Sequence, residues 1–92
     1  MIRLSGRLIC PTPEAVGRLN RHLPEHTALT RAEPGCLSFE VTPTVDPLVW
    51  RVEEKFTDRA AFDAHQARTG ASRWAEVTAD ITRDYEISDT ES

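Results

Sequence analysis

The sequence predicts an α+β domain in which an antiparallel sheet carries helices on one of its faces. Four segments alternate apolar and polar residues with a period of two, which is typical of half-buried strands. Between them, two longer stretches begin with capping residues and repeat apolar side chains at helical spacing. The order is strand, helix, strand, strand, helix, strand, and a chain of 92 residues is long enough for one such domain.

The first strand is expected over residues 2–10, because every second side chain of IRLSGRLIC, starting from Ile2, is apolar or small. Thr12 then supplies an N-cap, and Pro13 has the backbone angle favoured at the first helical position. Apolar residues at helical spacing carry this helix to about residue 32.

Two features should shape that helix. Pro24 lies inside it and removes one backbone hydrogen bond, so it should kink the helix or split it in two. Glu33-Pro34-Gly35 should end it, since proline cannot continue a helix and glycine tolerates a positive φ.

A hairpin is expected next. Residues 36–42, CLSFEVT, and residues 48–56, LVWRVEEKF, both alternate, and the short proline-bounded loop PTVDP joins them. One face of the second of these strands carries Leu48, Trp50, Val52, Glu54 and Phe56.

Asp58 caps the second helix, whose inward side is expected to carry Ala61, Phe62 and His65. Gly70 interrupts this helix, and a short helix with Trp74 and Val77 is expected after it. Residues 81–87, ITRDYEI, predict the last strand. One domain therefore spans residues 1–87, and residues 88–92 form a polar tail.

This order predicts a split βαβ, ferredoxin-like sandwich with both helical segments on one face of the sheet. In that topology the third strand separates the first from the second, so Cys10 and Cys36 should not be bonded to each other. The other face of the sheet is left without cover. A second subunit laid sheet against sheet would cover it, and we expect a homodimer.

Composition excludes several classes of partner. The chain has 11 basic and 15 acidic residues and a formal net charge of −4, so it lacks a basic surface for nucleic acid. No apolar run approaches the roughly 20 residues that span a bilayer, and the N-terminal residues are too polar for a signal peptide, so we expect a cytoplasmic protein that does not bind membranes. The cysteines have no ligand spacing, and His22 and His26, although four residues apart, are expected on the surface or at a pocket rim. We therefore expect no metal site.

Two stretches carry a specific resemblance. RAEPGCLSFEV at 31–41, followed by WRVEEKFTDRAAFDAH at 50–65, resembles the antibiotic biosynthesis monooxygenase family, which includes the quinol monooxygenases. The shared pattern is a helix ending in Glu-Pro-Gly-Cys, a strand, a glutamate two residues before an aromatic, an aspartate cap, an alanine-rich turn and a histidine. The resemblance covers residues 1 to about 87, and its pattern falls on Glu33, Pro34, Gly35, Cys36, Glu54, Phe56, Asp58, Ala61 and His65.

The resemblance implies a homodimeric α+β barrel and oxygenation of an aromatic quinol, polyphenol or anthrone by O2 without flavin, haem or metal. Such a substrate, once deprotonated, can itself give an electron to dioxygen. The protein then needs a dry aromatic pocket, a proton acceptor and a donor that stabilises the anion. Haem-degrading relatives bind haem through a histidine on the corresponding helix and an asparagine near the first strand. The asparagine of this chain, Asn20, lies on the first helix, which counts against haem degradation.

His65 is the first candidate catalytic residue. A helical rise of about 1.5 Å per residue carries the chain roughly 10 Å from Asp58 to His65, which equals about three residues of strand. If the helix runs back along the preceding strand, His65 lies level with Glu53 and Glu54. Glu54 is on the apolar face, so it should be buried against the imidazole, favour its protonated form and fix its tautomer, as a general base requires. The alternative is a clamp that fastens the second helix to the sheet.

The remaining candidates concern the ligand. Trp74, Trp50, Phe39 and Tyr85 are the aromatic candidates for substrate-binding pocket walls, with plain core packing as the alternative. Arg51, or Arg83, could hold a phenolate oxygen, or could be solvated or paired at an interface. The rival to the enzyme is a non-catalytic dimeric barrel that binds an apolar or aromatic small molecule, or haem.

Overall fold

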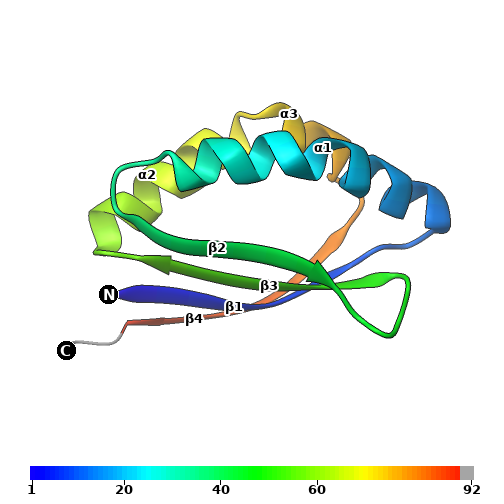
Figure 1. Ribbon diagram of the computed structural model, residues 1–92, viewed down its shortest axis with the longest axis horizontal. Coiled ribbons are helices and arrows are strands. Elements are labelled where there is room, and N and C mark those ends of the chain that lie inside the picture. The colour runs from blue at the N-terminus through cyan, green and yellow to red at the C-terminus, as the bar shows by residue number, and fades with distance from the viewer. Residues whose placement is uncertain (90–92) are drawn as a thin grey trace.

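The computed structural model describes residues 1–89 and confirms the predicted α+β architecture (Figure 1). Its strands and helices follow the predicted order, with the second helical segment in two pieces. Their bounds are β1 Ile2–Ile9, α1 Pro13–Arg31, β2 Cys36–Pro43, β3 Val49–Phe56, α2 Arg59–Gly70, α3 Arg73–Val77 and β4 Thr82–Asp89. Within the described chain, none of these helices combines the length and apolar character needed to cross a membrane.

The four strands form one antiparallel sheet in the order β2-β3-β1-β4. This is the predicted ferredoxin-like arrangement, in which β3 separates β1 from β2. Cys10 and Cys36 are accordingly both free, as predicted.

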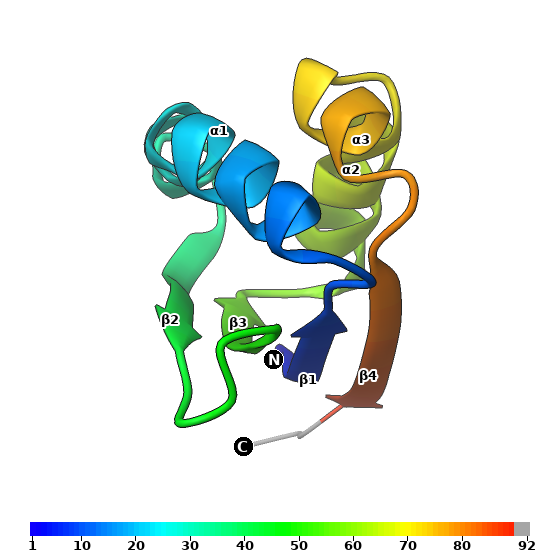
Figure 2. The same ribbon diagram turned by 90° about the vertical axis from the view of Figure 1, so that its right-hand side faces the viewer.

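All three helices cover one face of the sheet (Figure 2). α1 lies over the β2 side, and α2 and α3 lie over the β4 side. The alternation of each strand decides which residues are buried beneath them. In β3, for example, Trp50, Val52, Glu54 and Phe56 are buried, as the pattern predicted.

The α1 helix is one continuous helix. The Thr12 hydroxyl accepts a hydrogen bond from the Ala15 N–H at 3.2 Å, which confirms the predicted N-cap. The helix runs through Pro24 without interruption, so the predicted alternative of two separate helices is wrong. Burial of one side of the helix stabilises it against the loss of one backbone hydrogen bond.

The chain leaves α1 through a tight turn at Gly35, whose φ of +85° is the left-handed conformation expected of a glycine after a helix. A side chain there would meet Ala61 Cβ at 2.6 Å, so this turn also sets how closely α2 approaches β2. The predicted cap at Asp58 is present, with Asp58 Oδ1 accepting from the Ala61 N–H at 2.8 Å, and α2 ends at Gly70 as predicted.

The outer face of the sheet, opposite the helices, is charged. Glu53 accepts hydrogen bonds from the Ser5 hydroxyl at 2.8 Å and from Arg51 at 2.9 Å, and Arg7 pairs with Asp84. β4 continues to Asp89, two residues beyond its predicted end, because Ile2 and Arg3 pair with Asp89 and Ser88. The rest of the predicted polar tail, residues 90–92, lies outside the described residues.

Candidate active site

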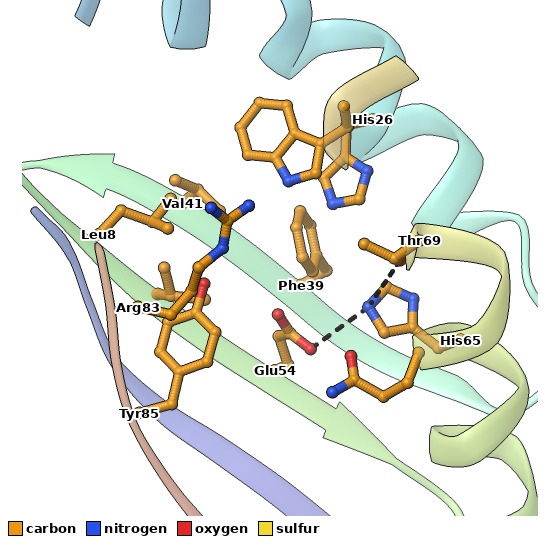
Figure 3. A pocket seen from close by; sticks show the side chains of 12 residues that line it. Leu8, His26, Phe39, Val41, Glu54, His65, Thr69, Arg83 and Tyr85 are labelled. Atoms are coloured by element: carbon orange, nitrogen blue, oxygen red, sulfur yellow. Dashed lines mark hydrogen bonds and ion pairs between the residues drawn. The ribbon is translucent and has the colours of Figure 1, made fainter. Parts of the chain in front are cut away.

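His65 lies on α2 and is buried between the helices and the sheet, with 2% of its surface exposed. Its Nδ1 lies 2.7 Å from Glu33 Oε1. Since an ionised carboxylate can only accept, this contact places a proton on Nδ1, and in the neutral imidazole the lone pair is then on Nε2. Nε2 faces the Thr69 hydroxyl at 3.4 Å and Glu54 Oε1 at 3.5 Å (Figure 3).

Glu33 is the partner of His65 that sequence reasoning missed. It lies in the turn after α1, where the sequence indicated a helix end and a position of the family pattern but no contact with His65. Its second oxygen accepts a hydrogen bond from Arg68 Nε at 2.6 Å. Burial alone would raise the pKa of Glu33, but the hydrogen bonds from Arg68 and His65 outweigh it and hold this pKa below its usual range. Glu33 therefore remains ionised and orients His65.

Glu54 points from β3 toward His65, so the predicted contact between these two residues is present. At 3.5 Å it is too long for a well-formed hydrogen bond, and Glu54 Oε1 is one of two buried side-chain atoms without a hydrogen-bond partner among residues 1–89. Burial, and secondarily the charge of Glu33, raise the pKa of Glu54 to about 7. This carboxyl group can thus gain or release a proton near neutral pH.

A cavity of about 290 Å³ opens beside this pair (Figure 3). Its size suits a small molecule of one to three fused rings. Apolar or aromatic residues and polar residues line it in equal number. The apolar and aromatic members are Leu8, Phe39, Val41, Val52, Trp74 and Tyr85, and the polar members are His26, Glu54, His65, Gln66, Thr69 and Arg83.

Of the predicted aromatic walls, Phe39, Trp74 and Tyr85 line the cavity. Trp50 does not, and its prediction as a pocket wall requires correction. It is buried on the same face of β3 as Glu54, but nearer the start of the strand, where it pairs with Leu8 and Pro43 and packs in the hydrophobic core.

Arg51 also lies outside the cavity. The alternation of β3 places it on the outer face of the sheet, where it is exposed and pairs with Glu53 at 2.9 Å. It cannot contact a ligand in this cavity. Arg83, the other arginine considered, does line the cavity, and it donates hydrogen bonds to the Thr78 hydroxyl at 2.6 Å and to the Ile81 carbonyl at 2.9 Å.

Tyr85 stands next to Arg83 on the cavity wall. Burial raises the pKa of its phenol to about 12, and the neighbouring Arg83 charge offsets only part of that effect. The hydroxyl therefore stays protonated and can donate a hydrogen bond to a ligand oxygen. Together, Tyr85 and Arg83 give the cavity a donor side on β4, across from His65 on α2 (Figure 3).

His26 was expected on the surface or at a pocket rim, and the structure places it at the cavity but buried, with 4% exposed. Its ring stacks on the Trp74 indole, with 4.5 Å between centroids and 1° between planes. The signal that could have found it is its spacing on α1. The buried side of α1 is formed by Ala15, Leu19, His26 and Thr30, which repeat at helical intervals.

Residues 1–89 contain no group of three or more histidine, cysteine, aspartate or glutamate side chains arranged to hold a metal ion.

Comparisons with known proteins agree with this fold. The family model described as antibiotic biosynthesis monooxygenase matches residues 1–77. A search of curated proteins found no match.

Solved structures resemble the whole chain. A candidate antibiotic biosynthesis monooxygenase from Deinococcus radiodurans superimposes with a TM-score of 0.85 at 21% identity and covers 100% of this chain and 94% of its own. One from Nitrosomonas europaea gives 0.84 at 18% identity, with 98% of both chains covered. One from Bacteroides thetaiotaomicron gives 0.76 at 30% identity, with 100% of this chain and 88% of its own covered.

Proposed function

Because the chain belongs to the antibiotic biosynthesis monooxygenase family, we propose that it is a monooxygenase that needs no cofactor and oxidises an aromatic quinol, polyphenol or anthrone-type molecule with O2. The observation that carries this proposal is the cavity of about 290 Å³ in which His65 and Glu54 meet an aromatic wall. An enzyme of this kind requires a base within reach of a bound ring, and this chain has two such groups side by side.

The first step is removal of a proton from the substrate. Figure 3 shows one oxygen of Glu54 turned toward His65 and the other turned toward the cavity. A hydroxyl or acidic C–H of the substrate gives its proton to this pair, and the Nε2 lone pair of His65 can share it. Glu33 acts as a positioning residue, because its hydrogen bond to Nδ1 keeps that lone pair directed at Glu54.

The substrate anion is stabilised by donors on the other side of the cavity. The Tyr85 hydroxyl and the Arg83 guanidinium both line it and can hydrogen bond to a developing phenolate or enolate oxygen. Apolar neighbours such as Leu8 and Val52 also line the cavity, so a ring bound against them would displace water from those donors.

Oxygen chemistry then proceeds on the substrate. The anion gives one electron to O2, and the resulting radical pair combines to form a carbon–oxygen bond and a peroxide, which takes up the first proton. Loss of a second proton from the same carbon breaks the O–O bond, leaves a carbonyl on the ring and releases water. A quinol or anthrone thus consumes one O2, retains one oxygen atom and releases the other with two substrate hydrogens as water.

Oxygen uptake by metal-stripped protein tests the proposal. A panel of hydroquinones and anthrones is supplied to the wild type and to His65→Ala, with the autoxidation rate without protein subtracted. We expect uptake by the wild type and a loss of about 100-fold or more in the variant, since positioned acid-base groups contribute roughly that factor. His22→Ala, which changes a histidine outside the cavity, is the matched control and should keep full activity.

Circular dichroism establishes that His65→Ala is folded before its rate is compared. Uptake that is equal in the two proteins would remove His65 from the mechanism. Absence of uptake by the wild type across the panel would instead favour the rival function, a non-catalytic barrel that binds an apolar or aromatic molecule or haem, in which His65 clamps α2 to Glu33.

We also propose that the working form is a homodimer that joins through the outer face of the sheet, and that it acts in the cytoplasm. The dimer proposal rests on the position of the helices, which all cover the other face of the sheet and leave this face for a second subunit (Figure 2). The two free cysteines support a reducing compartment.

A further inference from the structure

His26 occupies a position where an apolar residue would be expected. It belongs to the buried side of α1 and packs between two aromatic rings, stacked on Trp74 at 4.5 Å and edge-on against Phe39 at 5.3 Å. A leucine or phenylalanine would fill this place without bringing a polar group out of water. A buried imidazole at this position therefore lowers the stability of the fold, unless its nitrogen atoms form hydrogen bonds.

Two residues that line the cavity each keep a buried polar side-chain atom without a hydrogen-bond partner. Among residues 1–89, the two buried side-chain atoms without a hydrogen-bond partner are His26 Nδ1 and Glu54 Oε1. Native proteins pair nearly all buried polar groups, so each exception calls for an explanation. Here the two exceptions belong to residues that line the same cavity.

Each of these residues has a second polar atom that is not sealed in the protein. Nε2 is the nitrogen that His26 can offer to a ligand, and Figure 3 shows its ring pointing into the cavity. Burial, together with the charge of Arg68, lowers the pKa of His26 to about 4. At neutral pH the ring is uncharged, so it offers one N–H donor and one acceptor.

We propose that His26 is a ligand-binding residue, which hydrogen bonds through Nε2 to one oxygen substituent of a flat aromatic ligand while Glu54 contacts another. The site then selects rings that carry two oxygen substituents over rings that carry one. This inference rests on the proposed function for the position of the ligand, and it does not require turnover.

The stack on Trp74 fits this role. Trp74 fixes the plane of the imidazole, so that Nε2 keeps its direction when no ligand is bound. A preorganised donor or acceptor loses little conformational entropy on binding.

The test is anaerobic calorimetry with naphthol, which has one hydroxyl, and with a panel of naphthalenediols that differ in hydroxyl spacing. The proteins are the wild type, His26→Phe and His22→Phe. Phenylalanine keeps the ring and its stack on Trp74 but removes both nitrogens. His22 lies one turn earlier on α1 and outside this cavity, so His22→Phe is the matched control.

We expect the wild type to bind its best diol about tenfold more tightly than naphthol, since one buried hydrogen bond is worth roughly that factor. His26→Phe should lose about tenfold for that diol and stay within about twofold for naphthol, while His22→Phe should bind both as the wild type does. The melting temperature of His26→Phe should equal or exceed that of the wild type, because an unpaired buried nitrogen is replaced by an apolar group.

Equal loss for diol and naphthol, no loss for either, or a wild type without preference would each overturn the proposal. A wild type that binds none of these rings would overturn it together with the proposed function. If diol binding depends on His26 but the protein takes up no oxygen, the ligand-binding role of His26 stands and only the proposed oxidation is rejected.

Discussion

Glu54 is a carboxyl group that the fold buries without a full complement of hydrogen bonds, and this has a measurable consequence for stability. Burial raises its pKa from 4.5 to about 7, so the folded protein holds the proton more tightly than the unfolded chain does. The stabilisation from this protonation is complete below about pH 4.5 and is lost as the pH rises through 7, by at most about 3 kcal/mol.

Glu54→Gln removes that dependence, because an amide does not ionise. The wild type loses up to about 3 kcal/mol of unfolding free energy as the pH rises from about 4 to about 8, and the variant does not. The unfolding free energy of the variant minus that of the wild type should therefore rise by up to about 3 kcal/mol over this range. Urea unfolding at the two pH values measures this gain. Glu86→Gln, on the exposed outer side of β4, is the control and should change little. A pH dependence of Glu54→Gln that matches the wild type would show that Glu54 is ionised already in the folded state.

At this scale, the sequence predicted some site residues and not others for a physical reason. Glu54 was predicted because strand alternation alone assigns it to the buried face. Glu33 was missed, because its partners His65 and Arg68 lie more than 30 residues away and only the fold brings them to 2.7 and 2.6 Å. His26 was expected on the surface or at a pocket rim, and its burial was missed because histidine is intermediate in burial, so its residue type alone does not decide the matter.

At the scale of elements, the pairing of β1 with β4 depends on a glycine. Gly6 lies opposite Tyr85, and a Cβ atom there would stand 2.2 Å from the Asp84 carbonyl oxygen and 2.9 Å from the Tyr85 ring. The Tyr85 ring, one of the cavity walls, thus packs directly over the β1 backbone. The absence of a side chain at Gly6 sets where that wall stands.

Gly6→Ala should therefore destabilise the protein by about 1–3 kcal/mol, because backbone atoms of β4 must move. It should also weaken ligand binding, since Tyr85 and Arg83 move with the strand. Gly17→Ala is the matched control, because a Cβ there has nothing within 4 Å and alanine favours a helix, so it should be neutral or stabilising. Denaturant unfolding of both variants provides the comparison. Equal stability of Gly6→Ala and the wild type would show that β4 can move away without cost.

Element boundaries were largely predictable because caps and breakers act locally. Thr12, Asp58 and Gly70 mark the ends of helices as expected. Pro24 was less predictable, since whether a helix survives a proline depends on how much tertiary packing supports it, and a local pattern does not contain that information.

At the scale of the whole molecule, the order of strands in the sheet could be predicted from the order of elements along the chain. What covers the outer face of the sheet could not be predicted in this way. That face pairs its own charges, with Arg3 and Arg51 on Glu53 and Arg7 on Asp84. In a two-fold symmetric dimer, the outer faces of the two subunits would meet. The charged residues of one subunit would then lie against the same set of charged residues of the other. Such an interface depends on matched charges and is weakened by salt.

The proposed dimer can be tested by sedimentation equilibrium. We expect a dimer at micromolar concentration and low salt, with dissociation favoured as salt is raised toward about 1 M. Arg51→Glu places a second acid beside Glu53 on this face and should shift the equilibrium to monomer by at least about tenfold. Arg21→Glu makes the same charge reversal on the helical side, where it is exposed, and should leave the dimer intact. A monomer under all conditions, or equal effects of the two reversals, would mean that the outer face has another role. Because the cavity lies between sheet and helices of one subunit, its ligand affinity should then be unchanged in the monomer.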